Sequence, residues 1–418
     1  MKNIIRNLNK KQLLLLVFNI VFIVAYIVVN TVARNSVESL FSQQEARRWE
    51  SEKNAYAQVS AFYSHQREMQ EIDISNIRSE VQLKLSQDAL NESKENARVW
   101  IDAYSGECIT EVRKDNNILS ATAVGVGGEF FQFHPSKLLS GGYISDEDTN
   151  HDRVVIDQGL AWAMFGSNDV VGMQLWMGNS IYTIAGVIQV EDDELTKAAY
   201  GDNNRIYMFY DELRKHQEEL TIACYEAVIP NPISNYALNT LKEACGIELQ
   251  AEQRNQKDAS FLNFESIEVI ENSNRYDTMN LLNQMKHMKL RIMQTNGIAY
   301  PYWENVARVV EEQQVVLLVA RMLILLLPCI SLLYWFCSMW KKRSWTTKDI
   351  VIWIIDQIKE KLNREGTTDK EDDCMDEVIL EDDAKNIMNK AEYVDEQIEE
   401  IIEEEFILVT DENIFDIK

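Results

Sequence analysis

The sequence predicts a membrane protein in which two transmembrane helices enclose an extracytoplasmic α+β domain, followed by an acidic cytoplasmic tail of helical and disordered segments. Three observations predict this fold class. Two long apolar runs lie at residues 13–33 and 315–340, glycine is concentrated between Gly106 and Gly201, and the last 78 residues are strongly acidic. The formal net charge of −26 argues against a nucleic-acid partner, because phosphate binding needs clustered Lys and Arg.

The first apolar run, residues 13–33, contains no charged residue. A helix of these 21 residues is long enough to cross a hydrocarbon core of about 30 Å. Residues 1–12 carry four basic residues and no acidic one, so the positive-inside rule places them in the cytoplasm. A signal peptide cleaved after Ala33 is the alternative, but signal cores usually span only about 7–15 residues. We therefore expect a retained transmembrane helix.

The second apolar run, residues 315–340, is followed at once by three basic residues. Its single charge, Arg321, lies within two turns of the outer end, where the side chain can snorkel to the interface. A functional intramembrane charge is the alternative interpretation. Both basic clusters lie on one side of the membrane. We therefore expect a protein of the cell membrane with both termini in the cytoplasm and residues 34–314 outside it.

Residues 34–105 are predicted to form a helical stalk outside the membrane. Neither Gly nor Pro occurs in residues 1–105, which favours helix throughout. Two stripes of apolar residues also indicate helices. One stripe consists of Ile74, Ile77, Val81 and Leu85, and the other of Trp49, Tyr56, Val59, Phe62 and Tyr63.

Residues 106–314 are predicted to form the core of the domain, with its β-rich part at about 106–210. Twelve of the fifteen glycines lie between Gly106 and Gly201, as expected for strands and turns. Residues 173–184 predict a hairpin, because Gly178 opens a two-residue turn between two short strands. Further elements are expected along the chain: strands at 153–156, 205–210, 224–229 and 264–270, and helices at 159–165, 236–245, 276–294 and from 302 onward.

The sequence predicts neither an enzyme nor a bound cofactor in this chain. The P-loop, G-x-S-x-G and H-E-x-x-H motifs are absent, and the five histidines show no ligand spacing. Four residues of one loop do alternate as in a calcium site: Asp146, Asp148, Asn150 and Asp152. However, His151 stands where that loop needs Gly, and Asp157 stands where a bidentate Glu is expected. A solvated acidic turn is therefore favoured over a metal site.

Three of the six cysteines lie in the predicted outer region. A disulfide between Cys224 and Cys245 is compatible with that location and would leave Cys108 unpaired. Three cysteines in 281 residues do not make a disulfide framework, so buried free thiols are favoured over this possible disulfide.

Residues 120–190 contain an ordered set of motifs. A glycine-rich run from Val124 to Tyr143 precedes the acidic turn, and it is followed by Val154–Gly166, Val171–Met173 and Tyr182–Val187. This order resembles the extracytoplasmic core domain of MacB-type ABC transporter permeases, which has a Gly before an acidic turn, a V-V-I strand, an L-A…L-F-G segment and a strand ending in V-x-G-V. The position between two membrane spans also matches, so the resemblance covers roughly residues 13–340.

The resemblance implies an α+β outer module with a β-rich insertion, in a permease that dimerises and works with a separate cytoplasmic ABC ATPase. Closure of the ATPase would be passed through the membrane helices to the outer domain, a mode called mechanotransmission. In different branches this serves export, lipoprotein extraction or activation of cell-wall hydrolases. The ATPase would dock on a helix just after the second span, at residues 341–362. That segment has one apolar face, formed by Ile350, Val351, Ile354, Ile355, Ile358 and Leu362.

The chain departs from the family pattern after residue 362. Family members continue with two further spans, whereas residues 363–418 form an acidic tail, and residues 341–418 hold 24 acidic and 11 basic residues. Our leading hypothesis is a permease-like, non-catalytic membrane subunit that couples a cytoplasmic ATPase to the outer domain, together with further permease subunits. The alternative is a membrane-anchored structural or signalling protein that keeps the outer domain without transport. A homo-oligomer or a hetero-oligomer is compatible with both.

Overall fold

The computed structural model describes residues 10–49, 55–90, 98–191, 193–201, 203–247, 267–292 and 297–341. The chain divides into two compact units, Ile20–Leu325 and a second unit of Met1–Asn19 with Leu326–Lys418. The apolar face predicted between Ile350 and Leu362 and the acidic tail at 363–418 lie outside the described residues.

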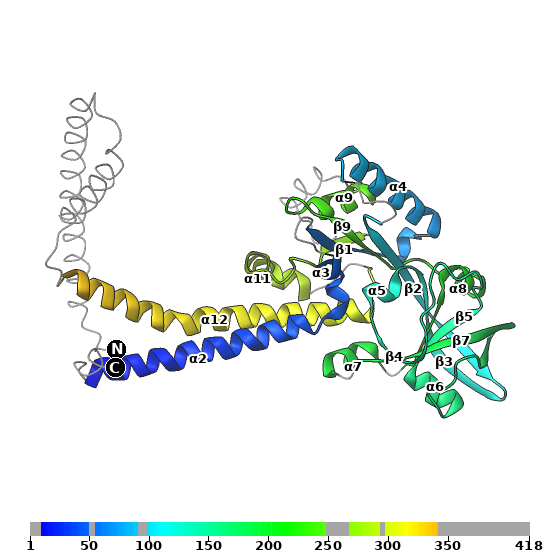
Figure 1. Cartoon of the computed structure of the whole chain (residues 1–418), viewed down its shortest axis with the longest axis horizontal. Helices are drawn as coiled ribbons and strands as arrows, with labels where there is room; N and C mark the ends of the chain where they lie inside the picture. The colour runs from blue at the N-terminus through cyan, green and yellow to red at the C-terminus, as the bar shows by residue number, and fades with distance from the viewer. Residues whose placement is uncertain are drawn as a thin grey trace, which may run out of the picture. The chain divides into compact units, whose positions relative to one another are not determined.

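Two long helices carry the apolar runs (Figure 1). Helix α2 spans Lys10–Glu38 and α12 spans Tyr302–Lys341, which at 1.5 Å per residue gives lengths of about 43 and 60 Å. Both are long and apolar enough to cross a membrane, and many of their large apolar side chains are exposed. The helices predicted at residues 13–33 and 315–340 are confirmed.

Polar side chains join α2 to α12. Within the unit Ile20–Leu325, Nε2 of Gln314 donates a hydrogen bond of 2.8 Å to the carbonyl oxygen of Ala33. Within the other unit, Nδ2 of Asn19 donates a hydrogen bond of 2.6 Å to the hydroxyl of Ser331. In apolar surroundings such bonds between neighbouring helices are typical, because water does not compete for them.

The segment after α2 is only partly helical, so the predicted helical stalk at 34–105 is wrong. The chain forms η1 (Phe41–Gln43), α3 (Glu45–Trp49), strand β1 (Tyr56–Tyr63), η2 (His65–Arg67) and α4 (Glu71–Gln87). Strand β1 is buried on both faces and lies between β9 and β10. A strand buried on both faces has no polar alternation, so its apolar residues resemble a helical stripe. Only the stripe from Ile74 to Leu85 is helical, as the buried face of α4.

The remaining strands and helices build the domain between the two long helices. The strands are β2 (Ile101–Lys114), β3 (Asn117–Gly128), β4 (Lys137–Gly141), β5 (Arg153–Asp157), β6 (Gln174–Met177), β7 (Ser180–Gln189), β8 (Arg205–Phe209), β9 (Cys224–Pro230) and β10 (Ile267–Glu271). The helices are α5 (Phe130–Phe133), α6 (Gln158–Phe165), α7 (Glu194–Tyr200), α8 (Tyr210–His216), α9 (Tyr236–Ala244) and α11 (Thr278–Ile292).

The strands form one sheet that partly closes into a barrel. Their order is β10-β1-β9-β2-β3-β8-β5-β7-β4, and β6 pairs with both β2 and β7. The pairs β2–β3, β3–β8, β8–β5, β5–β7, β7–β6 and β6–β2 therefore make a closed ring of six strands. Strand β2 belongs to both parts: Ile101–Ser105 pairs with β9 in the open sheet, whereas Val112 and Arg113 pair with β6 in the barrel.

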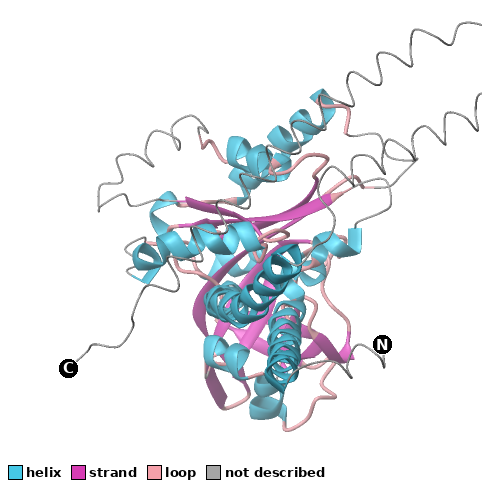
Figure 2. Cartoon of the chain, turned by 90° about the vertical axis from the view of Figure 1, so that its left-hand side faces the viewer, coloured by secondary structure: helices cyan, strands magenta, loops and turns pink. Residues whose placement is uncertain are grey.

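Two apolar cores lie on opposite faces of the sheet, and Figure 2 shows helices on both sides of the strands. Along β1, Val59, Ala61 and Tyr63 belong to one core and Phe62 belongs to the other, as the alternation of side chains in a strand requires. The first core includes residues of α4, α9 and the barrel, and the second includes residues of α3, α5 and the start of α12.

Most elements predicted after residue 106 are confirmed. Strands β6 and β7 form the hairpin, with Met177 opposite Ser180 and with Gly178 at φ +58°. The predicted strands correspond to β5, β8, β9 and β10, and the predicted helices to α6, α9, α11 and α12. Residues 264–266 of the predicted strand at 264–270 lie outside the described part of the chain.

Cys224 and Cys245 are buried free thiols, as the sequence favoured, and the possible disulfide between them is not formed. Cys224 in β9 packs in the core beside Phe62, whereas Cys245 follows α9 in the core on the other face of the sheet. The hydroxyl of Tyr63 lies 3.3 Å from the sulfur of Cys245. Burial raises the pKa of the Cys245 thiol to about 11 and raises that of Cys224 well above its ordinary value, so both thiols are unreactive at neutral pH.

Cysteine alkylation tests whether Cys224 and Cys245 are free thiols. At pH 8, iodoacetamide should leave Cys224 and Cys245 unmodified in the folded chain, because both thiols are buried and protonated. After denaturation without a reductant, mass spectrometry should find both residues labelled. Labelling that requires prior reduction would show that the disulfide exists.

Alanine substitutions at two glycines with positive φ distinguish the cost of backbone strain from the cost of a steric clash. A Cβ atom at Gly141 (φ +75°) would lie 2.1 Å from the carbonyl oxygen of Ala185, whereas a Cβ atom at Gly172 (φ +80°) has no heavy atom within 4 Å. Gly172→Ala should therefore lower the free energy of unfolding by about 1–2 kcal/mol, which is the cost of placing alanine in the left-handed conformation. Gly141→Ala should cost about 1–3 kcal/mol more, because the backbone must also shift. Equal losses in denaturant unfolding of the two variants would contradict the packing of β4 on β7.

Candidate functional site

The first three turns of α12, residues 302–311, are packed against the domain. We call these turns and their contacts the helix joint. The ring of Trp303 is 4% exposed and lies 4.2 Å from the ring of His134 and 5.8 Å from that of Phe130, measured between centroids. The ring of Tyr302 lies 4.9 Å from that of Tyr200, and the guanidinium of Arg205 lies 4.8 Å above it. Aromatic contacts from two sides therefore fix the start of α12.

A buried cluster of charges forms the second part of the helix joint. Arg275, in the loop between β10 and α11, donates two hydrogen bonds to Glu304, of 2.9 and 3.0 Å, and one of 2.9 Å to Glu311. The three side chains are 2%, 0% and 1% exposed. Arg308 donates a further bond of 2.7 Å to Glu304 and one of 2.8 Å to Glu268 of β10.

The spacing along α12 explains why these residues meet. Glu304, Arg308 and Glu311 lie four and then three residues apart, so a helix places them on one face. Burial acts against the charge on Arg275, but the carboxylates of Glu304 and Glu311 and the neighbouring Tyr276 hold its pKa well above the ordinary value. Rotation or sliding of α12 would leave these buried charges without partners, and such a loss costs about 3–5 kcal/mol. The cluster therefore fixes α12 relative to β10.

The segment that directly follows α2, η1 with the start of α3, is joined to the same sheet by hydrogen bonds to Gln58 of β1, which is fully buried. The side-chain oxygen of Gln58 accepts a bond of 3.0 Å from the backbone N–H of Glu45, and its Nε2 donates a bond of 2.6 Å to the carbonyl oxygen of Ser42. The hydroxyl of Ser273, two residues before Arg275 in the chain, accepts a bond of 2.8 Å from the N–H of Gln58. Both long helices are thus attached within a few residues of each other.

A buried polar chain links this region to His134. Asn272 donates to the hydroxyl of Ser60 at 2.8 Å, and that hydroxyl donates to Glu226 at 2.9 Å. The other carboxylate oxygen of Glu226 pairs with Nε2 of His134, which stacks on Trp303. Glu226 on one side and the ring of Trp303 on the other therefore hold the imidazole of His134 in place.

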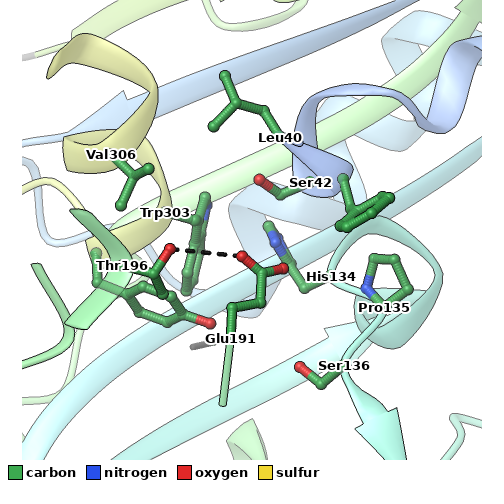
Figure 3. A pocket seen from close by; sticks show the side chains of 11 residues that line it. Leu40, Ser42, His134, Pro135, Ser136, Glu191, Thr196, Trp303 and Val306 are labelled. Atoms are coloured by element: carbon green, nitrogen blue, oxygen red, sulfur yellow. Dashed lines mark hydrogen bonds between the residues drawn. The ribbon is translucent and has the colours of Figure 1, made fainter. Parts of the chain in front are cut away.

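A small cavity of about 30 Å³ lies beside His134 and Trp303, and Figure 3 shows its lining. Nδ1 of His134 and Nε1 of Trp303 are buried and have no hydrogen-bond partner among the described residues. The carboxylate of Glu191, which accepts a bond of 3.4 Å from Thr196, also lines the cavity, and burial raises the pKa of this carboxyl group. The space holds a water molecule or two, which could satisfy these polar atoms.

In the predicted acidic turn, the carboxylates of Asp146 and Asp148 accept hydrogen bonds from nearby backbone N–H groups. Asp146 accepts a hydrogen bond of 2.8 Å from the N–H of Gly128, and Asp148 accepts one of 3.1 Å from the N–H of Ser145. The group in the described chain whose ligand atoms come close enough for a metal ion is a different one, His151, Asp211 and Glu212. There Nδ1 of His151 already pairs with Asp211 at 2.9 Å, which accounts for their proximity without a metal.

The helix joint was not predicted from the sequence. The available signal was the occurrence of Glu304, Arg308 and Glu311 at helical spacing among buried apolar residues of α12, because charges on an apolar face need a partner. Their partner Arg275 lies 29 residues from Glu304 in the chain, in a loop without a recognisable motif. Only the fold brings the charges together.

Comparisons with known proteins agree with the ordered motifs of residues 120–190. A family model described as MacB-like periplasmic core domain matches residues 13–236. The chain is similar to two proteins named "Macrolide export ATP-binding/permease protein MacB". The one from Pasteurella multocida (strain Pm70) is 25% identical over 168 residues, which cover 38% of this chain and 24% of that protein. The one from Chromobacterium violaceum is 29% identical over 97 residues, which cover 22% of this chain and 15% of that protein. The chain thus matches less than a quarter of the length of either relative.

Two solved structures are also similar to this chain. The periplasmic region of MacB from Actinobacillus actinomycetemcomitans is 14% identical, with a TM-score of 0.35, and the match covers 53% of this chain and 92% of that structure. The extracellular domain of the noncanonic ABC-type transporter YknZ from Gram-positive bacteria is also 14% identical, with a TM-score of 0.32, and the match covers 51% of this chain and 99% of that structure.

Replacement of Arg275 tests the buried cluster. Arg275→Met leaves Glu304 and Glu311 buried without their cation and should lower the free energy of unfolding by about 3–5 kcal/mol. Lys215→Met, the control, removes a cation that is 63% exposed and pairs with Glu212, and it should cost less than about 1 kcal/mol. Unfolding of the detergent-solubilised full chain in denaturant measures both.

A combined variant checks the physical cause. Adding Glu304→Gln and Glu311→Gln to Arg275→Met removes the uncompensated charges and should recover much of the lost stability. If Arg275→Met costs no more than Lys215→Met, the cluster does not fix α12 to the domain.

Proposed function

The chain belongs to the family of the MacB-like periplasmic core domain, and on that premise we propose that it is a permease-like, non-catalytic membrane subunit of an ABC-type transport or mechanotransmission system. In this proposal α2 and α12 cross the cell membrane, both termini are cytoplasmic, and the domain between the helices lies outside. A cytoplasmic ABC ATPase, together with further permease subunits, moves the helices, and the domain carries out the resulting work.

The helix joint is the observation that carries this proposal. A displacement can travel from one side of a membrane to the other only if the helix that carries it is continuous and firmly attached to the domain it moves. Helix α12 is one helix from Tyr302 to Lys341, and its buried charges pair with Arg275 of the domain. A flexible linker at this point would absorb the displacement, whereas buried, fully paired charges resist it.

The barrel supports the same proposal. Strand β2 runs from the open sheet, which adjoins the helix joint through β9, β1 and β10, into the closed ring of six strands. A twelve-pair register between β2 and β3, from Ala103–Gly128 to Lys114–Asn117, joins the two parts without interruption. Packed elements of this kind shift as units, so motion of α12 is expected to reorient the barrel as a body.

The partner is expected on the cytoplasmic side. The segment at 341–362 is the proposed contact for the ATPase, through the apolar face formed by Ile350, Val351, Ile354, Ile355, Ile358 and Leu362. ATP is then bound and hydrolysed by the partner, and no cofactor is assigned to this chain. An apolar helical face beside a membrane surface needs a protein partner, because water cannot cover it favourably.

Affinity purification tests the proposal. The tagged full chain, extracted from its native membranes in a mild detergent, should co-purify with an ABC ATPase identified by mass spectrometry. Deletion of residues 345–362 should reduce recovery of the ATPase at least tenfold, whereas Arg275→Met, which affects the domain end of α12, should leave recovery unchanged. The same Arg275→Met protein should lose the cellular phenotype that depends on the chain.

The same purification includes a control variant. Lys215→Met should retain both ATPase recovery and phenotype, because this exposed residue is outside the helix joint. Absence of any ATPase, or unchanged recovery after the deletion, would favour the alternative of a membrane-anchored structural or signalling protein.

A further inference from the structure

A polar groove of about 460 Å³ lies where α2, α12 and the start of α11 come together, within the unit Ile20–Leu325 (Figure 1). Three arginines line it, Arg34 and Arg321 from the two long helices and Arg47 from α3. Amide and hydroxyl side chains fill the spaces between them: Asn30, Gln43, Gln44, Asn272, Ser273, Thr278 and Gln314. This volume is in the range of a site for a small ligand or a lipid headgroup.

The groove is lined by three arginines and only two acidic residues. Arg34 pairs with Glu38 of its own helix at 2.6 Å, in an exposed ion pair. Arg321 donates to the side-chain oxygen of Asn30 at 3.1 Å, and neither it nor Arg47 has a carboxylate partner among the described residues. The remaining acidic residue of the lining is Asp277. The groove therefore presents two guanidinium groups without a carboxylate partner, and the N–H donors that Arg321 does not use on Asn30 and Leu317, with those of Arg47, can take an anion.

Acceptors without donors lie along the same groove. The side-chain oxygens of Gln43 and Asn272 are buried and unpaired in the described structure, although both residues line the groove. The orientation of Asn272 is fixed, because the hydroxyl of Ser60 donates to Glu226 and so can only accept from Nδ2 of Asn272. An unpaired buried acceptor destabilises the free protein, and a ligand with N–H groups can supply the missing donor.

The position of the groove points to a lipid. Arg321 is the seventh residue of the apolar run that begins at Val315, about 9 Å along the helix axis, and Arg34 directly follows the run 13–33. Exposed apolar side chains of both helices continue from this level: Val28 and Val32 on α2, and Val316, Val319 and Met322 on α12. If α2 and α12 span the membrane, the arginines reach the headgroup layer and the apolar side chains contact acyl chains.

We propose that this groove binds one phospholipid of the outer leaflet through a zwitterionic headgroup that contains a phosphate and a primary ammonium, as in phosphoethanolamine. Arg47 and Arg321 bind the phosphate, and Asp277 with the amide oxygens of Gln43 and Asn272 accepts hydrogen bonds from the ammonium. The acyl chains lie along α2 and α12. The inference rests on the membrane placement in the proposed function, but not on coupling to an ATPase.

Lipid analysis of the purified full chain tests the proposal. After extensive washing in detergent, the wild-type chain should retain about one phosphatidylethanolamine per protein in native mass spectrometry. Arg47→Gln and Arg321→Gln should each reduce retention about tenfold, because each removes charge-assisted bonds to phosphate, whereas Arg321→Lys should keep most of it. Arg214→Gln, which removes an exposed cation from α8, is the matched control and should change nothing.

Adding lipids back distinguishes the headgroups. Phosphatidylethanolamine should rebind to delipidated protein in preference to phosphatidylglycerol, and Asp277→Asn should abolish this preference while leaving phosphate binding intact. Inorganic phosphate at 10 mM, an order-of-magnitude excess over the lipid probe, should fail to displace the lipid, because it lacks the acyl contacts. Displacement by phosphate, a preference for phosphatidylglycerol, or equal retention by all arginine variants would overturn the proposal.

The result is separable from the proposed function. Failure of the chain to remain in the membrane pellet after carbonate washing would refute membrane placement itself. Retention of lipid without co-purification of an ATPase would refute coupling and support the lipid site.

Discussion

The guanidinium of Arg275, buried between Glu304 and Glu311, determines how the long helix α12 meets the domain. Taking three charged groups out of water is costly, and their attraction compensates only when the geometry is kept. The two carboxylates lie seven residues apart on one face of α12, and the arginine comes from the loop after β10. This pairing permits one rotation and one axial position of the helix. The aromatic contacts of Tyr302 and Trp303, which directly precede Glu304, are compatible with that same position.

The sheet extends this constraint through the domain. β10 carries Glu268, which pairs with Arg308 of α12, and β10 pairs with β1, whose Gln58 binds the segment that directly follows α2. From β1 the ladder continues through β9 to β2, and β2 enters the barrel. The two long helices therefore attach to one end of a continuous hydrogen-bonded ladder, and the barrel forms the other. The proposed function, in which motion of the two long helices reaches the barrel, depends on this continuity.

The proposed lipid groove lies beside the helix joint and uses neighbouring residues. Asn272 and Ser273, which line the groove, lie three and two residues before Arg275, and Gln314 lies three residues after Glu311 on α12. A lipid bound there would contact α2, α12 and the domain simultaneously. Its headgroup would add cross-links between the helices at the level where they leave the membrane, so that lipid binding and helix position would be thermodynamically linked.

The sequence by itself determined the features that depend on neighbouring residues. Uninterrupted apolar runs specify the two long helices, Gly178 between two short strands specifies the hairpin, and the ordered motifs of residues 120–190 identify the domain. These signals are local, because a helix or a tight turn is selected by residues a few positions apart.

Tertiary structure decided everything that depends on residues far apart in the chain. Strand β1 was predicted as helix because burial on both faces, by α9 on one side and α3 on the other, removes the alternation that marks a strand. The thiols of Cys224 and Cys245 are on opposite faces of the sheet, which no spacing reveals. The pairing of Arg275 with Glu304 and Glu311 likewise arises only when β10 is placed beside α12. A charge in the sequence shows that a partner is needed, and only the packed chain selects which one.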